Sequence, residues 1–111
     1  MAATASAFEA LSDPTRREIV DLLRSGELEA GQIAAHFSTS RPGISRHLRV
    51  LREHQLVRVR SDGQRRIYTL DPAPFQELDR WLEPYREFWA QSLYALDARI
   101  RSVRKKRGGQ L

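Results

Sequence analysis

The chain has 111 residues, which is room for one modest hydrophobic core, so a second domain is not expected. It contains no cysteine, which excludes disulfides, thiolate metal sites, thiol redox sensing and cysteine nucleophiles. The net charge of +5 is unevenly distributed: residues 41–66 hold eight arginines against Glu53 and Asp62, residues 99–107 hold six cations and no acid, and the remainder is acidic.

Two basic blocks on an acidic body indicate a surface for a polyanion, because neutralising phosphates releases their bound counterions. A solvated surface or a solubilising tail is the alternative, and for residues 99–107 it stays open. Residues 1–12 lack a basic leader followed by an apolar stretch, and no apolar run approaches the roughly 20 residues that span a bilayer. The chain is therefore expected in the cytoplasm, with no membrane partner.

Helix start and stop signals predict four helices before residue 56. Asp13 can cap a helix whose first turn holds Pro14, and the polar turn 38–40 can cap another. The predicted helices run up to about Ser12, from Pro14 to about Arg24, from about Ala30 to Phe37, and from about Arg41 to Gln55. The last two are short and joined by a few residues, which is the helix-turn-helix arrangement.

After Leu56 the apolar period changes from helical to alternating. Val57 and Val59 face one way and the arginines that follow them face the other. Residues 61–64 are predicted to form a hairpin turn and residues 65–70 the return strand. The sequence therefore predicts a mainly α fold with a β-hairpin wing, a winged helix-turn-helix in a single domain over residues 1–111.

Asp71 and Pro72 end the hairpin and open a long C-terminal helical region. Its apolar residues are Phe75, Leu78, Leu82, Tyr85, Trp89, Leu93, Leu96, Ile100 and Val103. The steps of three and four persist for about four heptads, more than a domain of this size needs internally, so they predict a partner surface. Pro84 is expected to break or kink the helix, since it lacks an amide hydrogen. Residues 105–111 are expected to form a basic flexible tail.

The predicted helix at 41–55 has two different faces. One stripe holds Ile44, Leu48 and Leu51, and the opposite stripe holds Pro42, Arg46, Arg49 and Glu53. Arg46 and Arg49 are the leading base or phosphate contacts, because the major groove admits one helix with long outward donors. Ser40, Arg41 and Ser45, near the helix start, suit the phosphate backbone. Solubility alone is the alternative interpretation of this face.

The predicted hairpin is basic as well. Arg58 and Arg60 lie on its first strand, and Arg65 and Arg66 follow the turn. Such arginines can enter a minor groove or hold phosphates, and we favour phosphate contact for most of them.

Three segments together carry a family resemblance. They are ALSDPTRREI at residues 10–19, SRPGISRHLRVL at residues 40–51 and RRIY at residues 65–68. The chain resembles the ArsR family of winged-helix repressors over about residues 7–100. The resemblance implies a symmetric dimer built from the first and C-terminal helices, two recognition helices over an inverted repeat, and repression. Gly43 departs from the family, which more often has alanine there.

Two sets of candidate residues follow. The candidate contacts to double-stranded DNA are Ser40, Arg41, Pro42, Gly43, Ser45, Arg46, His47, Arg49, Arg58, Arg60, Arg65 and Arg66. The candidate dimerisation residues, from segments 1–12 and 72–104, are Phe8, Leu11, Leu78, Leu82, Tyr85, Trp89, Leu93, Leu96 and Ile100.

The resemblance also raises metal sensing, which many relatives perform through cysteines before the turn or through histidine and carboxylate ligands on the last helix. Residues 31–37 have no cysteine, and no histidine follows His54. His36, His47 and His54 form no ligand pair with zinc or nickel spacing. No metal and no cofactor are therefore predicted. His47 is expected to pack or to contact phosphate, and the other two histidines are expected on the surface.

The sequence predicts a sequence-specific DNA-binding transcriptional regulator, a homodimeric repressor on an inverted repeat, and not an enzyme. It has no nucleophile elbow, phosphate loop or zinc-protease motif. The alternatives are a nickel- or zinc-responsive or partner-assisted regulator, and a winged-helix module that binds another protein. The aromatic residues Trp81, Tyr85, Phe88 and Trp89 could line an effector pocket, although a dimer core is favoured.

Overall fold

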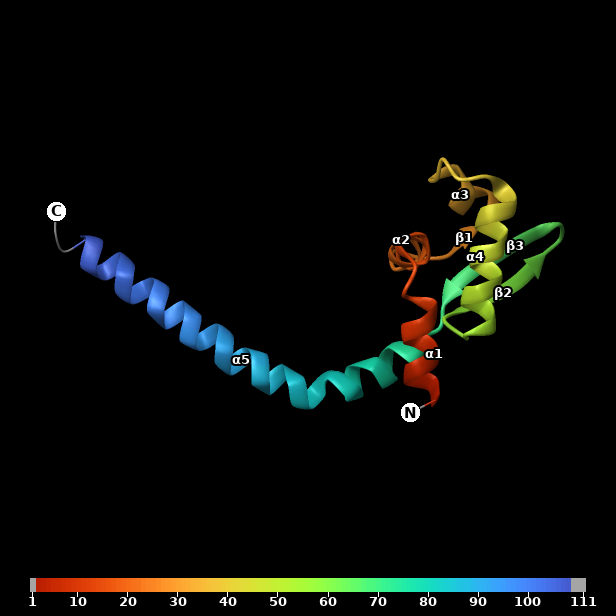
Figure 1. The fold of residues 1–111 in the computed structure, drawn as a ribbon. Coiled ribbons are helices and arrows are strands. Elements are labelled where there is room, and N and C mark those ends of the chain that lie inside the picture. The colour runs from red at the N-terminus through yellow and green to blue at the C-terminus, as the bar shows by residue number, and fades with distance from the viewer. Residues whose placement is uncertain (1, 109–111) are drawn as a thin grey trace. The chain divides into compact units, whose positions relative to one another are not determined.

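A computed structural model describes residues 2–108 and divides the chain into two compact units, Met1–Leu78 and Asp79–Leu111. The elements, labelled in Figure 1, are α1 (Ala2–Ala10), α2 (Pro14–Leu23), β1 (Leu28–Glu29), α3 (Ala30–Ala35), α4 (Arg41–Glu53), β2 (Val57–Asp62), β3 (Arg65–Leu70) and α5 (Pro72–Gly108). The predicted winged helix-turn-helix is confirmed, with one strand added and the ends of the first four helices moved by up to two residues.

The start of α2 is built as predicted. Asp13 accepts a hydrogen bond from the amide of Arg16 at 3.0 Å, and Pro14 occupies the first turn. The guanidinium of Arg16 donates from Nε to the carbonyl of Ala10 at 2.6 Å. The same residue that completes the cap therefore also fastens the end of α1 to α2.

The turn between α3 and α4 ends on a capping serine. Ser40 accepts from the amide of Gly43 at 3.3 Å. A Cβ atom at Gly43 would lie 2.8 Å from Cγ2 of Thr39 and 3.3 Å from Oγ of Ser40. Glycine at position 43 therefore leaves room for the methyl group of Thr39, which an alanine side chain would approach too closely.

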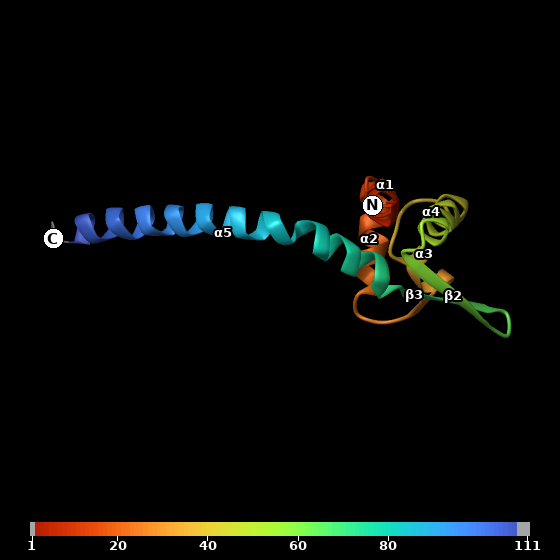
Figure 2. The same cartoon turned by 90° about the horizontal axis from the view of Figure 1, so that it is seen from below.

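The sheet has three antiparallel strands in the order β1-β3-β2, and Figure 2 shows its hairpin extending past α4. Gly63 and Gln64 alone form the turn, so the first strand reaches two residues further than expected, to Asp62, while the return strand begins at Arg65 as predicted. The φ of +62° at Gly63, with no positive φ at Gln64, is the pattern of a type II′ hairpin turn. The two-residue β1 was not predicted, because so short a strand has no period to detect.

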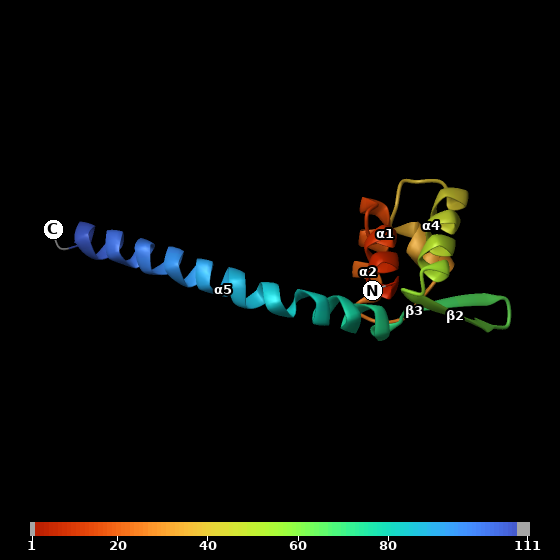
Figure 3. The same ribbon diagram turned by 60° about the horizontal axis from the view of Figure 1, so that its bottom comes forward.

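The core lies between α4, the other helices and the sheet. Its largest fully buried side chains are Ile19, Ile33, Ile44, Leu51 and Leu56. Helix α4 contacts α2, α3 and β2. Figure 3 shows the hairpin of β2 and β3 below α4 in that view. Phe75 and Leu78, from the first turns of α5, pack partly against this core. Helix α4 is thus held by neighbouring elements on three sides and free on the fourth.

Helix α5 runs unbroken from Pro72 to Gly108 with Pro84 inside it, so of the expected break or kink at Pro84 the break does not occur, and the kink stays a prediction. A proline without an amide hydrogen removes one helical hydrogen bond, and the turns on both sides continue. Helix α5 includes residues 105–108 of the predicted basic tail, while residues 109–111 lie outside the described residues. No helix in the described range 2–108 is both long enough and apolar enough to cross a bilayer.

Candidate nucleic-acid interface

The two faces of α4 separate as predicted. Ile44, Leu48 and Leu51 are at most 2% exposed, whereas Arg46 and Arg49 are exposed. Neither arginine has a hydrogen bond or an ion pair within the described part of the chain. Two cations whose charge is not neutralised by the protein therefore stand on the free face of the helix.

Within residues 41–66, three further arginines share this unpaired state: Arg41, Arg52 and Arg66. Arg52 is missing from the predicted set. It lies one turn after Arg49 and borders the buried stripe, so the helical wheel assigned it to neither face. Its spacing of three from Arg49 was the signal that could have found it.

The other hairpin arginines have carboxylate partners. Arg60 donates two hydrogen bonds to Glu27 at 2.9 and 3.1 Å. Arg58 pairs with Asp71 at 3.1 Å. Arg65 pairs with Glu29 and, at 3.7 Å, with Asp62. Four carboxylates thus offset these three guanidinium groups, and this part of the wing carries no excess of positive charge.

The strand register explains this division. Ile67 pairs with Arg60 and Thr69 with Arg58, so Arg58, Arg60 and Arg65 share one face of the hairpin. Arg66 belongs to the opposite face with Tyr68, which is 7% exposed and part of the core. The opposite face is the one covered by α4, so Arg66 and the helix arginines lie on the same side of the sheet.

His47 lies between helices. Its Nδ1 is 3.8 Å from Oδ2 of Asp13 and 3.4 Å from a guanidinium nitrogen of Arg16. Its side chain is 22% exposed. The hydrogen bond from the Arg16 amide, opposed by partial burial and aided by the charges of His47 and Arg16, lowers the pKa of Asp13. Of the two expected roles for His47, packing against α2 fits these contacts.

The remaining histidines differ from one another. His54 was expected on the surface, but it is partly buried and its Nδ1 lies 2.7 Å from Oγ of Ser6, so it joins the end of α4 to α1. His36 is exposed, as expected, and lines a cavity of about 370 Å³ beside α2.

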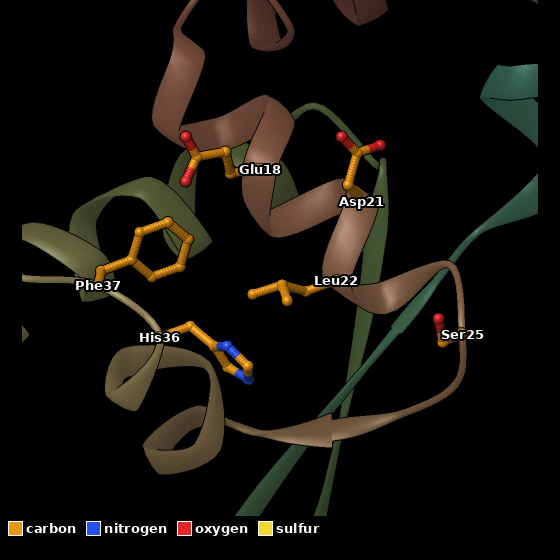
Figure 4. Close-up of a pocket in the computed structure, with 6 residues that line it drawn as sticks. All are labelled: Glu18, Asp21, Leu22, Ser25, His36 and Phe37. Carbon is orange, nitrogen blue, oxygen red and sulfur yellow. The ribbon is translucent and has the colours of Figure 1, made fainter.

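That cavity does not assemble a metal site. Figure 4 shows the carboxylates of Glu18 and Asp21 pointing apart, with neither directed at the imidazole ring of His36. Within the described residues, no group of three or more histidines and carboxylates is placed to hold a metal ion.

The candidate dimerisation residues fall into two groups. Leu11 and Leu78 are half-buried and pack against the chain's own core. The α5 residues beyond them are more open, with exposed fractions of 48% for Tyr85, 59% for Leu93 and 52% for Leu96. Phe8, Trp89 and Ile100 are likewise exposed, and Leu82 is intermediate. The rings of Trp81 and Tyr85 lie against each other at a tilt of 36°, with centroids 4.9 Å apart.

Comparison with known proteins agrees with this architecture. Residues 13–59 match the family model for the arsR family of bacterial regulatory proteins. The transcriptional repressor SdpR of Bacillus subtilis is 43% identical over 75 residues, which cover 68% of this chain and 83% of that protein. The regulator Rv2034 of Mycobacterium tuberculosis is 42% identical over 87 residues, 78% of each chain. An ArsR-like transcriptional regulator from Rhodococcus sp. RHA1 has a TM-score of 0.68 at 34% identity, covering 86% of this chain and 90% of that one.

Proposed function

Because the chain belongs to the ArsR family and is a DNA-binding transcriptional regulator, we propose that it is a homodimeric repressor that inserts α4 into the major groove of an inverted repeat. The observation that carries this proposal is the free face of α4, where Arg46 and Arg49 are exposed and unpaired within the described chain. A helix fixed on three sides by its own core offers only this face to a ligand.

Within this proposal the contacts divide by chemistry. Arg46 and Arg49 reach base edges, since guanidinium groups donate to two acceptors of guanine at once. Arg41 and the exposed Ser45 contact the sugar-phosphate backbone. Pro42 is exposed beside them, while Ser40 and Gly43 shape the start of the helix through their mutual cap.

The paired wing arginines have a different assignment. Arg58, Arg60 and Arg65 hold the hairpin to neighbouring carboxylates, so we leave them out of the contact set that supplies affinity. His47 supports α4 from its inner side. The proposed set is therefore narrower than the sequence alone suggested.

Dimerisation supplies the second reading helix. The exposed apolar stripe of α5 is the surface that a second copy would cover, and a symmetric dimer would place the two α4 helices about one turn of DNA apart, roughly 34–36 Å. In this proposal the protein acts in the cytoplasm, needs no cofactor and catalyses no reaction. It represses transcription where its binding site overlaps a promoter.

The test is selection of preferred sites from random duplex DNA, followed by binding measurements on the recovered site. An inverted repeat is expected. Arg46→Ala and Arg49→Ala should each weaken binding by about 1–3 kcal/mol and relax the preference at one base position per half-site. Arg60→Ala serves as the control, because it removes one charge of the same type from the paired face of the wing. Recovery of no motif, or equal effects of all three variants on every DNA, would contradict the proposal.

A further inference from the structure

A cleft of about 220 Å³ lies between α4 and β3. Its lining includes Ser45, Arg49 and Arg52 from the helix and Arg66 and Tyr68 from the strand. The three helix residues share one flank, because they follow each other at steps of four and three. Arg66 shares a strand face with Tyr68, which places it on the helix side of the sheet.

The cleft gathers positive charge without neutralising it. Arg49, Arg52 and Arg66 are all exposed, and none has a carboxylate partner among the described residues. The arginines on the other face of the same hairpin all have one. Three guanidinium groups around one cleft repel each other unless an anion lies between them, and their planar forks match the oxygens of a phosphate group.

We propose that this cleft holds one backbone phosphate of DNA, clamped between Arg52 of the recognition helix and Arg66 on the second strand of the wing, where it pairs with Ser61 close to the turn. This inference rests on the proposed function and adds two positioning residues to it. Ser45, on the same flank, has a hydroxyl that can donate to the same phosphate, and the buried Tyr68 closes the floor of the cleft. A phosphate held by both elements fixes the depth and rotation of α4 in the groove, so Arg46 and Arg49 meet the bases in one register.

The experiment compares Arg52→Gln, Arg66→Gln and the double variant with Arg60→Gln. Arg60→Gln is the matched control, since it removes the same charge from the same hairpin but from the face where Glu27 already neutralises it. Affinity for the selected site and for an unrelated duplex is measured over a series of salt concentrations. Thermal melting by circular dichroism checks that each variant is folded.

Each single cleft variant is expected to bind about tenfold more weakly to both duplexes alike, because a phosphate contact carries no sequence information. The double variant should lose less than the product of the two single losses, since both side chains act on one phosphate. For the double variant, the slope of the logarithm of the binding constant against the logarithm of the salt concentration should become shallower by about 1.8. A dimer loses two phosphate contacts, and each contributes about 0.9 to the slope. Arg66→Lys should keep most of the slope, and the control should stay within about twofold of wild type.

Two results would overturn the clamp alone. Cleft variants that match Arg60→Gln would show that no phosphate lies there, and full multiplication of the two single losses would show that Arg52 and Arg66 act on separate phosphates. Absence of salt-dependent binding by the unmodified protein would overturn the proposed function as well, and the two failures are thereby distinguished.

Discussion

Gly43 sits where two residue-scale effects oppose each other. Alanine would gain about 1 kcal/mol of helix propensity, but its Cβ would lie 2.8 Å from Cγ2 of Thr39. Thr39 is exposed and must rotate or shift to make room. We therefore expect Gly43→Ala alone to change the free energy of unfolding little, and to stabilise by about 1 kcal/mol once Thr39→Ser has removed the methyl group.

Urea denaturation of the two single variants and the double variant measures this coupling. Ser40 is unchanged throughout, so the cap is common to all four proteins. Equal effects of Gly43→Ala in both backgrounds would contradict the steric explanation.

Asp13 makes the stability of the helix pair depend on pH. The hydrogen bond from the Arg16 amide, together with the nearby charges of His47 and Arg16, holds the pKa of Asp13 below its ordinary value of 3.8. A carboxylate whose pKa is lower in the folded state stabilises the fold fully above the unfolded value and loses that contribution as the pH falls through the folded value. We expect Asp13→Ala to cost about 1 kcal/mol at pH 7, as loss of a helix cap does.

The pH dependence is the discriminating part of that measurement. The deficit of Asp13→Ala relative to wild type should stay constant down to about pH 4 and shrink below the ordinary pKa of 3.8. Asp13→Asn is the control, because it keeps an acceptor at the cap and should show a smaller deficit at pH 7. A deficit that is the same at pH 7 and pH 3 would exclude the ionised cap as its cause.

At the scale of elements, the C-terminal cap of α4 places a non-glycine residue in a left-handed backbone conformation. Gln55 has a φ of 64°, and the amides of Gln55 and Leu56 each donate at 2.9 Å, to the carbonyls of Arg52 and Leu51 respectively. This is the Schellman arrangement, in which glycine suits the left-handed residue. Gln55→Gly should stabilise the protein by about 0.5–1 kcal/mol, measured by its melting temperature. Gln64→Gly, at an exposed turn position without a positive φ, should not stabilise.

Most of the element pattern was predictable because its signals are local. Asp13 with Pro14 marks a helix start, and the change from helical to alternating period after Leu56 marks the wing. β1 was not predictable, since Leu28 and Glu29 form a strand only by pairing with β3, about forty positions away.

The residues of the candidate site likewise divide into those that a local sequence pattern predicts and those that depend on tertiary contacts. The free face of α4 follows from one helix's own period, and Arg46 and Arg49 were identified from it. Which hairpin arginines are neutralised depends on tertiary contacts, such as that between Arg60 and Glu27, which no local pattern records. Arg52 became a candidate only when the strand carrying Arg66 was placed beside it.

For the whole molecule, the pairing of charges separates two uses of arginine. Where carboxylates lie opposite, as for Arg58 with Asp71, arginine ties the wing to the body of the protein. Where they are absent from the described surroundings, as at Arg49 and Arg66, arginine is left to an external anion. The net charge of +5 alone would not distinguish these uses, so affinity should follow the unpaired set and not the total.

The last prediction concerns assembly. The stripe of α5 that includes Leu93, Leu96 and Ile100 is between 43% and 59% exposed and repeats at steps of three and four, so a second copy that covers it removes apolar area from water. Leu96→Glu would place a charge in that contact and should shift the protein from a mass near twice 12.8 kDa towards 12.8 kDa in light scattering.

Tyr94→Glu is the matched control, because Tyr94 is 76% exposed on the same helix but lies off the stripe. Loss of the dimer should also abolish the preference for an inverted repeat over a single half-site, since one protomer carries one reading helix. A monomeric wild type, or equal dissociation by both variants, would show that this stripe is not the contact between protomers.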